Sequence, residues 1–262
     1  MGEAREAAGI GGATGVADED RPGRVEGRHG LRLPPGQRPV EGFPRFGAHL
    51  HRPPPAIPDD HAIEVGGAVT GGFAVPLAEL ARLPRRELTA DFHCVAGWSA
   101  VDLRWEGVAF ETFYRDVIAP ALAGDSPVTH VVFEGLDGHR SVVTIEDALH
   151  ADVLLAETLD GRPLDGDHGA PVRLVSPSQY GYISTKHLSR IEVRTSGVTD
   201  PPASVADRLL AEHPRSRVWE EERHGRLPGR WVRPVYRLLI PPIRYLCARG
   251  ARVRNGPGRR EG

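Results

Sequence analysis

Cys94 is the residue whose position best suits chemistry in this sequence. It ends an alternating stretch, Asp91-Phe92-His93-Cys94, and Ala96-Gly97 follow, so its sulfur can be presented into a cleft. The chain has two cysteines, which form neither a disulfide framework nor a CxxC pattern. A lone cysteine is also often a small buried apolar residue. A thiolate assisted by His93 is disfavoured, because neighbouring strand residues point to opposite faces.

A second group of polar residues lies between positions 167 and 186. It contains His168 and Arg173, and after them the segment from Tyr180 to Lys186. Lys186 is the only lysine among 33 basic residues. An arginine can bind a phosphate through two nitrogen atoms, and a lysine acts on it as a point charge. The pattern suits an anionic ligand with many hydrogen-bonding edges, although a solvated polar loop has the same composition.

Short strands and few long helices are expected to position these residues. Alternating apolar residues and turn signals predict strands at 62–69, 73–75, 87–94, 105–110, 129–134, 141–145, 153–157, 171–175 and 191–194. Helical spacing predicts helices at 76–83, 111–118, 146–150 and 204–212. Many short strands with short helices indicate an α+β, mainly β fold.

Composition divides the chain into three parts. Residues 1–45 are rich in Gly, Ala, Arg, Glu and Pro without periodicity, and we expect them to be largely disordered. Residues 46–224 are expected to form the domain, and residues 225–262 a basic Arg/Pro-rich tail. The net charge of −2 does not favour nucleic acid as a partner. No apolar run approaches the roughly 20 residues that span a bilayer, and no export signal is evident, so we expect a cytoplasmic location.

The tail has a charge of its own. Residues 225–262 contain ten Arg and one Glu, a local charge of +9, so the rest of the chain carries −11. Between Trp231 and Cys247 the arginines alternate with apolar residues. This pattern fits a weak contact with the inner membrane face, and equally a disordered basic tail or a strap on the acidic body.

Three separated motifs resemble the molybdopterin-binding oxidoreductase domain of the sulfite oxidase superfamily. The first is HCVAGWS at 93–99, followed by Leu103–Val108. The second is Asp160–Leu164 leading into HGAPVRLVSP, and the third is YGYISTKHLSRIEV. Their order and spacing agree with the family over residues 45–224. Trp98 and Ser99 match the bacterial branch that includes the methionine-sulfoxide reductase catalytic subunit.

The resemblance implies a molybdenum–molybdopterin cofactor in a sulfite-oxidase-type fold. Cys94 would be the metal ligand, in keeping with the affinity of soft thiolates for such metals. Tyr182, or its neighbour Tyr180, would line the approach to the metal unless it is a packed wall residue. The cofactor contacts expected from the same match are His93, Ser99, Arg104, His168, Arg173, Ser184 and Lys186.

Departures from the family pattern bear on substrate and assembly. Sulfite oxidases follow the ligand cysteine with a basic segment, whereas Val95–Ala100 here contains no cation, which disfavours sulfite. The chain after Arg194 is too short for the family's immunoglobulin-like dimerisation domain, so we expect a monomer. No haem or iron–sulfur motif is present, so a separate electron-transfer partner is expected.

The expected activity is two-electron oxygen-atom transfer on a small oxo-substrate or sulfoxide. Two alternatives stay open at this point. One is a non-catalytic binding module with the same fold, which the retained Cys94, Arg173 and Lys186 disfavour. The other is a thiol enzyme that uses Cys94 with a distant histidine.

Overall fold

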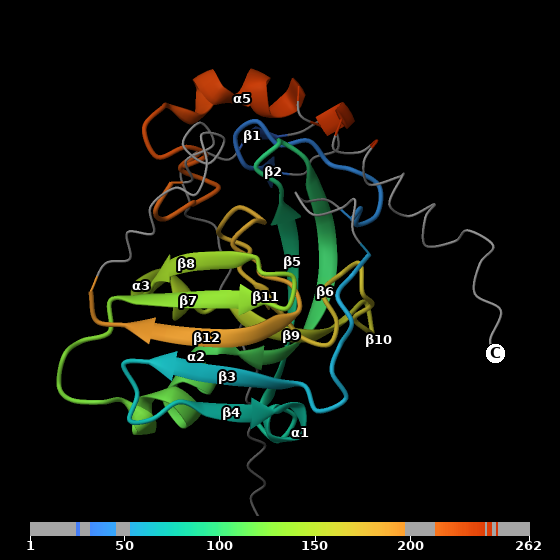
Figure 1. Cartoon of the computed structure of the whole chain (residues 1–262). Coiled ribbons are helices and arrows are strands. Elements are labelled where there is room, and N and C mark those ends of the chain that lie inside the picture. Colours follow the sequence, from blue (N-terminus) through green and yellow to red (C-terminus); the bar gives the residue numbers. More distant parts are fainter. Residues whose placement is uncertain are drawn as a thin grey trace, which may run out of the picture.

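The structure is a computed structural model, and it describes residues 25–26, 32–45, 53–196, 213–238, 240–242 and 245. Two five-stranded sheets form the body, and a short two-stranded sheet joins β1 (Val25–Glu26) to β2 (Arg32–Leu33). In Figure 1 the long strands of one sheet run across the direction of the other sheet's strands. The expected α+β, mainly β fold is confirmed.

The first sheet combines hairpins with one parallel pair. Its strands follow the spatial order β4 (Phe73–Pro76), β3 (Ala62–Gly67), β12 (Leu188–Arg194), β7 (His130–Gly135) and β8 (Arg140–Thr144). β12 pairs parallel with β3 and antiparallel with β7. β7 and β8 form an antiparallel hairpin, and its turn uses Gly138 at a φ of 80°.

The second sheet carries the candidate site. It consists of β5 (Arg85–His93), β6 (Ser99–Ala109), β9 (Leu154–Leu159) and β10 (Arg162–Pro163), with β11 (Arg173–Val175) paired to β9. The strand predicted from Trp105 begins six residues earlier, at Ser99. Pairing with β5 over this stretch supplies the hydrogen bonds that a local pattern does not reveal.

The α-helices of the described residues are α1 (Leu77–Leu80), α2 (Phe110–Phe113), α3 (Ile145–Ala148) and α5 (Gly229–Leu238). α1 and α3 are shorter than the helices predicted at 76–83 and 146–150, and α5 is a helix that the sequence did not predict. After α2 the chain widens into a π-helical turn at Tyr114–Ile118 and ends in a 3₁₀ turn at Ala119–Ala121. Pro120 lacks a backbone N–H and cannot continue the α-helical ladder. The helix predicted at 204–212 lies outside the described residues.

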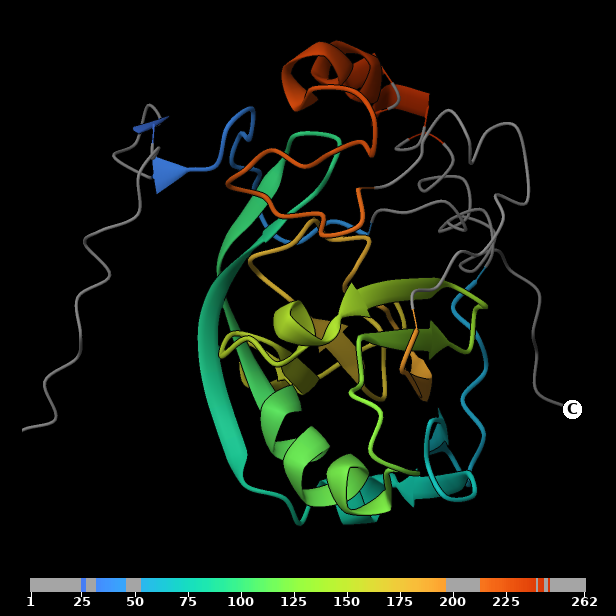
Figure 2. The ribbon, with the colours of Figure 1, turned by 90° about the vertical axis from the view of Figure 1, so that its left-hand side faces the viewer.

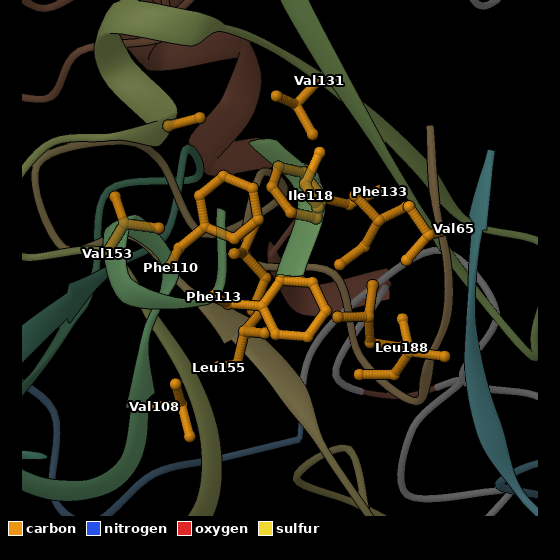
Figure 3. Close-up of a cluster of buried hydrophobic side chains, with 14 of the residues drawn as sticks. Val65, Val108, Phe110, Phe113, Ile118, Val131, Phe133, Val153, Leu155 and Leu188 are labelled. Carbon is orange, nitrogen blue, oxygen red and sulfur yellow. The ribbon is translucent and has the colours of Figure 1, made fainter. Parts of the chain in front are cut away.

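Two buried clusters share the second sheet. The larger lies between the sheets and contains Phe110, Phe113 and Phe133 (Figure 3). The smaller contains Cys94, Trp98 and Trp105. Successive side chains of a strand point to opposite faces, so Leu155 and Leu174 enter the larger cluster while their neighbours enter the smaller one or face it.

Residues 32–45 are ordered, contrary to the expectation for the segment 1–45. Arg38 exchanges backbone hydrogen bonds with Gly97 and Ser99, and Val40 N donates to Ser99 O at 2.9 Å. Phe43 packs against Phe92 and Trp105, with ring centroids 4.8 and 5.7 Å apart. Composition alone missed this segment because its order comes from contacts with residues about 50 or more positions away in the sequence.

We predict that Gly107→Ala destabilises the fold. A Cβ at Gly107 would lie 1.9 Å from Leu155 O, where β6 pairs with β9 and backbone cannot yield. The expected loss is at least about 2 kcal/mol in the free energy of unfolding, measured by urea denaturation. Gly66→Ala is the matched control, since its Cβ meets only the flexible Arg190 guanidinium at 3.4 Å. Equal stabilities for the two variants would contradict this.

Candidate functional site

A tight turn presents Cys94 at the end of β5. Gly97 N donates to Cys94 O at 2.9 Å, and Cys94 N donates to Trp98 O at 2.8 Å. Gly97 has a φ of 99°, which favours glycine, and a Cβ there would lie 3.0 Å from Gly36 O. The turn lies at the end of the second sheet nearest α5 (Figures 1 and 2).

A buried polar chain braces this turn from behind. His93 and Ser99 are cross-strand partners, and His93 Nδ1 lies 2.7 Å from Ser99 Oγ. Ser99 Oγ donates to Gln37 Oε1 at 3.1 Å, so it accepts from His93 Nδ1–H. Gln37 Nε2 donates to Cys94 O at 3.0 Å. Burial lowers the pKa of His93 to about 4, and the ring is therefore neutral at physiological pH.

The Cys94 thiol is buried and forms no disulfide. Its residue is 7% exposed, within a cluster that includes Ala96, Trp98 and Ala100. Burial raises the pKa of Cys94 to about 12, although a backbone hydrogen bond from Ala96 and the charge of Arg223 favour the thiolate. Without a metal the sulfur is a neutral thiol.

Arg223 is a cation near Cys94 that sequence reasoning missed. Its guanidinium donates to Val95 O and to Pro35 O, the latter at 3.0 Å. It also lies 5.0 Å from the centre of the Tyr180 ring. The residues directly after Cys94 include no cation, and the expectation for the site was based on them. In the structure the cation is Arg223, which lies more than 120 residues later in the sequence. No local signal in the sequence indicates this pairing.

Arg173 is fully buried on the Cys94 side of β11. Its three nitrogen atoms donate to the carbonyl oxygens of Leu174, His168 and Ser184, at 3.3, 2.9 and 3.1 Å. Its guanidinium lies between 5.2 and 5.7 Å from the ring centres of Trp105, Phe92 and Phe43. Burial lowers the pKa of Arg173 to about 9, which leaves it charged at neutral pH.

Lys186 and His168 lie beside Arg173. Lys186 Nζ donates to Asp167 O at 2.6 Å, and burial together with the charges of Arg173 and Arg45 lowers its pKa to about 7. Gly169 permits this approach, since a Cβ there would lie 3.0 Å from Lys186 and 3.1 Å from Arg173. His168 is held by Asp165 and by Phe43 O, at 2.8 and 2.9 Å. Ser184 Oγ accepts from the backbone N–H of Ser176.

The Cys94 turn and this cationic group are linked through Phe92 and Gly181. Gly181 N donates to His93 O at 2.8 Å. A Cβ at Gly181 would lie 2.1 Å from the ring of Phe92, which itself packs against Arg173. The structure therefore brings together six of the predicted site residues, in one continuous group: His93, Cys94, Ser99, Arg173, Ser184 and Lys186.

The two candidate tyrosines have different surroundings. Their rings stack with centroids 6.4 Å apart. Tyr182 Oη donates to Ser216 Oγ at 2.5 Å, and the side chain packs partly against the larger cluster. Tyr180 is fully buried beneath Arg223, and its hydroxyl has no hydrogen-bond partner among the described residues. Of the two, Tyr180 is the one linked to the Cys94 turn through Arg223.

Arg104 lies on the exposed side of β6, away from Leu103 and Trp105. Its backbone exchanges hydrogen bonds with Asp160. Asp160 lines an open depression of about 420 Å³ together with Leu159, Arg162, Pro163, Leu164, Asp165 and His168. Arg104 is thus linked through Asp160 to the rim of this depression and not to the Cys94 turn.

The donor set matches a metal carried by an anionic organic cofactor. Within the described residues, no three His, Cys, Asp or Glu side chains gather to hold a metal ion. A single soft thiol is available instead, beside two cations whose described partners are carbonyl oxygens and aromatic rings. The buried Trp105 Nε1 and Tyr180 Oη also lack hydrogen-bond partners among the described residues. These groups suit a ligand that offers a metal, a phosphate and hydrogen-bonding edges.

Comparison with known proteins identifies the domain. The family described as "Oxidoreductase molybdopterin binding domain" matches residues 49–200, more than half of the chain. The chain is 30% identical to the uncharacterized oxidoreductase YuiH of Bacillus subtilis, over 62% of this chain and 78% of that protein. It is 32% identical to mouse mitochondrial sulfite oxidase, over 62% of this chain and 35% of that protein.

A further relative is named as a candidate protein-methionine-sulfoxide reductase subunit, YedZ1, of Azospira oryzae. The two are 34% identical over 51% of this chain, and the match spans about half of the relative (49%). The agreement of the family match with the buried cysteine and the cationic group leads to one conclusion. The chain belongs to the oxidoreductase molybdopterin-binding domain family of the sulfite oxidase superfamily, and its cofactor is molybdenum–molybdopterin.

Proposed function

We propose that this chain is a molybdenum-dependent oxidoreductase in which Cys94 is the protein ligand to the metal. When bound, the cofactor supplies two-electron oxygen-atom transfer, and the protein binds, orients and tunes it. The observation that carries the proposal is a buried free thiol in the same region of the fold as two cations that have no ion-pair partner among the described residues. A buried cation without an anion is costly unless a ligand supplies one.

Each residue has a distinct task in this proposal. Cys94 would hold the metal as the thiolate, with its proton released to solvent, because coordination requires deprotonation. Arg223 favours that charge and fixes the turn through Val95 O. Arg173 and Lys186 hold the cofactor's phosphate. The hydrogen-bonded side chains of Gln37, Ser99 and His93 keep the sulfur in place. Tyr182 and Tyr180 are the candidates to line the substrate-binding site.

The proposed substrate is a small oxo-compound or sulfoxide, and electrons are exchanged with a separate protein. Two relatives are named as a subunit and as a catalytic subunit of protein-methionine-sulfoxide reductases, which supports a partner of this kind. The thiol-enzyme alternative is disfavoured, since His93 is bonded to Ser99 and the pKa of Cys94 is raised. The monomeric state and the cytoplasmic location remain predictions of the sequence.

We predict that Cys94→Ser loses molybdenum. The protein is expressed in a host that makes the cofactor, and metal is measured by mass spectrometry beside pterin fluorescence. We expect at least about a tenfold drop in molybdenum per chain, because the alcohol is a poor ligand at neutral pH. Cys247→Ser, which changes the other cysteine, should keep the wild-type metal content. Full retention of molybdenum by Cys94→Ser would refute Cys94 as the ligand.

We also predict that Cys94 resists alkylation in the native, cofactor-free protein. A pKa of about 12 leaves almost no thiolate at pH 8, and the sulfur is also shielded from solvent. Iodoacetamide treatment followed by peptide mass mapping should label Cys94 only after denaturation. Rapid labelling of the native protein would instead favour a thiol enzyme.

A further prediction concerns how the effect of Lys186 on stability depends on pH. Its pKa is about 7 in the fold and near 10.5 when unfolded, so the unfolded chain binds the extra proton between these values. Cofactor-free wild-type protein should therefore gain stability relative to Lys186→Met as the pH rises from 7 to 10. Below pH 7 the penalty of the buried cation is complete.

Lys186→Met also separates the effect of this lysine on thermal stability from its effect on cofactor binding. At pH 7, cofactor-free Lys186→Met should melt at or above the wild-type temperature, while its pterin content falls by about tenfold. Arg190→Met, at an exposed position, is the control and should change neither. Retention of pterin by Lys186→Met would show that this lysine does not hold the cofactor.

A further inference from the structure

Helix α5 presents an exposed apolar face. Trp231, Val235 and Leu238 follow one another at helical spacing and are 65, 56 and 76% exposed. Leu227, just before the helix, is also exposed, at 48%. Side chains of this size are usually covered when they line up along a helix. In Figures 1 and 2 the helix forms the upper surface of the molecule, on the side away from both sheets.

The opposite face of α5 is fixed to the body. Val232 and Tyr236 are each 7% exposed, and Tyr236 Oη donates to Arg223 O at 3.3 Å. Arg233 forms an ion pair with Glu221. One alternative for the tail, packing against the acidic body, is therefore observed for α5. This packing leaves the apolar face of α5 exposed to solvent.

The sequence that contains α5 and follows it is strongly basic. From Arg226 to Arg260 the sequence contains ten arginines and no Asp or Glu. Arg226 and Arg230 are exposed next to the apolar face, and Arg237 lies on the same flank of the helix as Arg230. An arginine-flanked helix with Trp, Val and Leu outward fits an interface that is apolar inside and anionic at its surface.

We propose that α5 docks on an anionic phospholipid bilayer, with Trp231, Val235 and Leu238 entering the headgroup region and the arginines contacting lipid phosphates. Within the described part of the chain, no helix is long and apolar enough to cross a bilayer. The contact is consequently peripheral, and it depends on both the apolar side chains and salt-sensitive charge.

The docked orientation would direct the Cys94 turn toward the membrane. Arg237 reaches Gly36 O at 3.5 Å, and Gly36 lies against Gly97 in the turn. Arg233, Glu221 and Arg223 link the helix to Val95 O. This orientation matters for electron exchange only if the proposed function holds, whereas lipid binding itself needs no cofactor.

Vesicle co-sedimentation of the full chain tests the proposal. The probes are vesicles of phosphatidylcholine alone and vesicles with phosphatidylglycerol added. The wild-type chain should bind the second kind only, and added salt should release it. The triple variant Trp231→Ser, Val235→Ser, Leu238→Ser keeps every arginine and should bind at least about tenfold more weakly. Ile57→Ser, an exposed apolar residue elsewhere, is the matched control.

Two further measurements make the outcome decisive. Trp231 emission should shift to the blue with phosphatidylglycerol vesicles, and the shift should vanish in Trp231→Phe. The triple variant should keep the wild-type melting temperature, since the changed side chains are exposed. Failure of the wild-type chain to bind protein-free anionic vesicles, or equal binding by the triple variant, would overturn the proposal. Lipid binding by the wild-type chain, together with a lack of molybdenum in protein from a host that makes the cofactor, would support this proposal and contradict the proposed function separately.

Discussion

Burial of the Cys94 thiol is the constraint on which the rest of the site depends. In the apolar cluster around Trp98 and Ala100 a thiolate is unstable by itself, which is why the pKa of Cys94 is raised to about 12. A metal that takes the thiolate removes this penalty. The hydrogen-bonded side chains of Gln37, Ser99 and His93 fix the backbone of the Cys94 turn and so position the sulfur.

The cationic group follows the same logic. Arg173 is held by three carbonyl oxygens and three aromatic rings, which compensate part of the cost of its burial. Burial likewise lowers the pKa of Lys186, whose ammonium donates to the backbone carbonyl of Asp167. The fold keeps two poorly paired cations next to a neutral thiol, an arrangement that lowers stability and that an anionic, metal-bearing cofactor would repair.

Much of the site could be predicted from short stretches of sequence. The alternation of apolar and polar residues predicted the strand that ends at His93. The motifs that contain His168, Arg173 and Lys186 predicted the cationic group. The remaining parts come from distant segments. Gln37 and Phe43 lie in a stretch without periodicity, and pairing with the Cys94 turn is what orders it. Arg223 reaches the turn through tertiary packing, and α5 contains Pro234, which local propensity reads as a helix breaker.

The ligand claim is tested most directly by X-ray absorption at the molybdenum edge of the wild-type, cofactor-loaded chain. The account predicts a sulfur neighbour of the metal in addition to the pair that the pterin dithiolene supplies, because Cys94 provides it. A spectrum that contains only the dithiolene sulfurs would contradict the assignment of Cys94, whatever the activity of the sample.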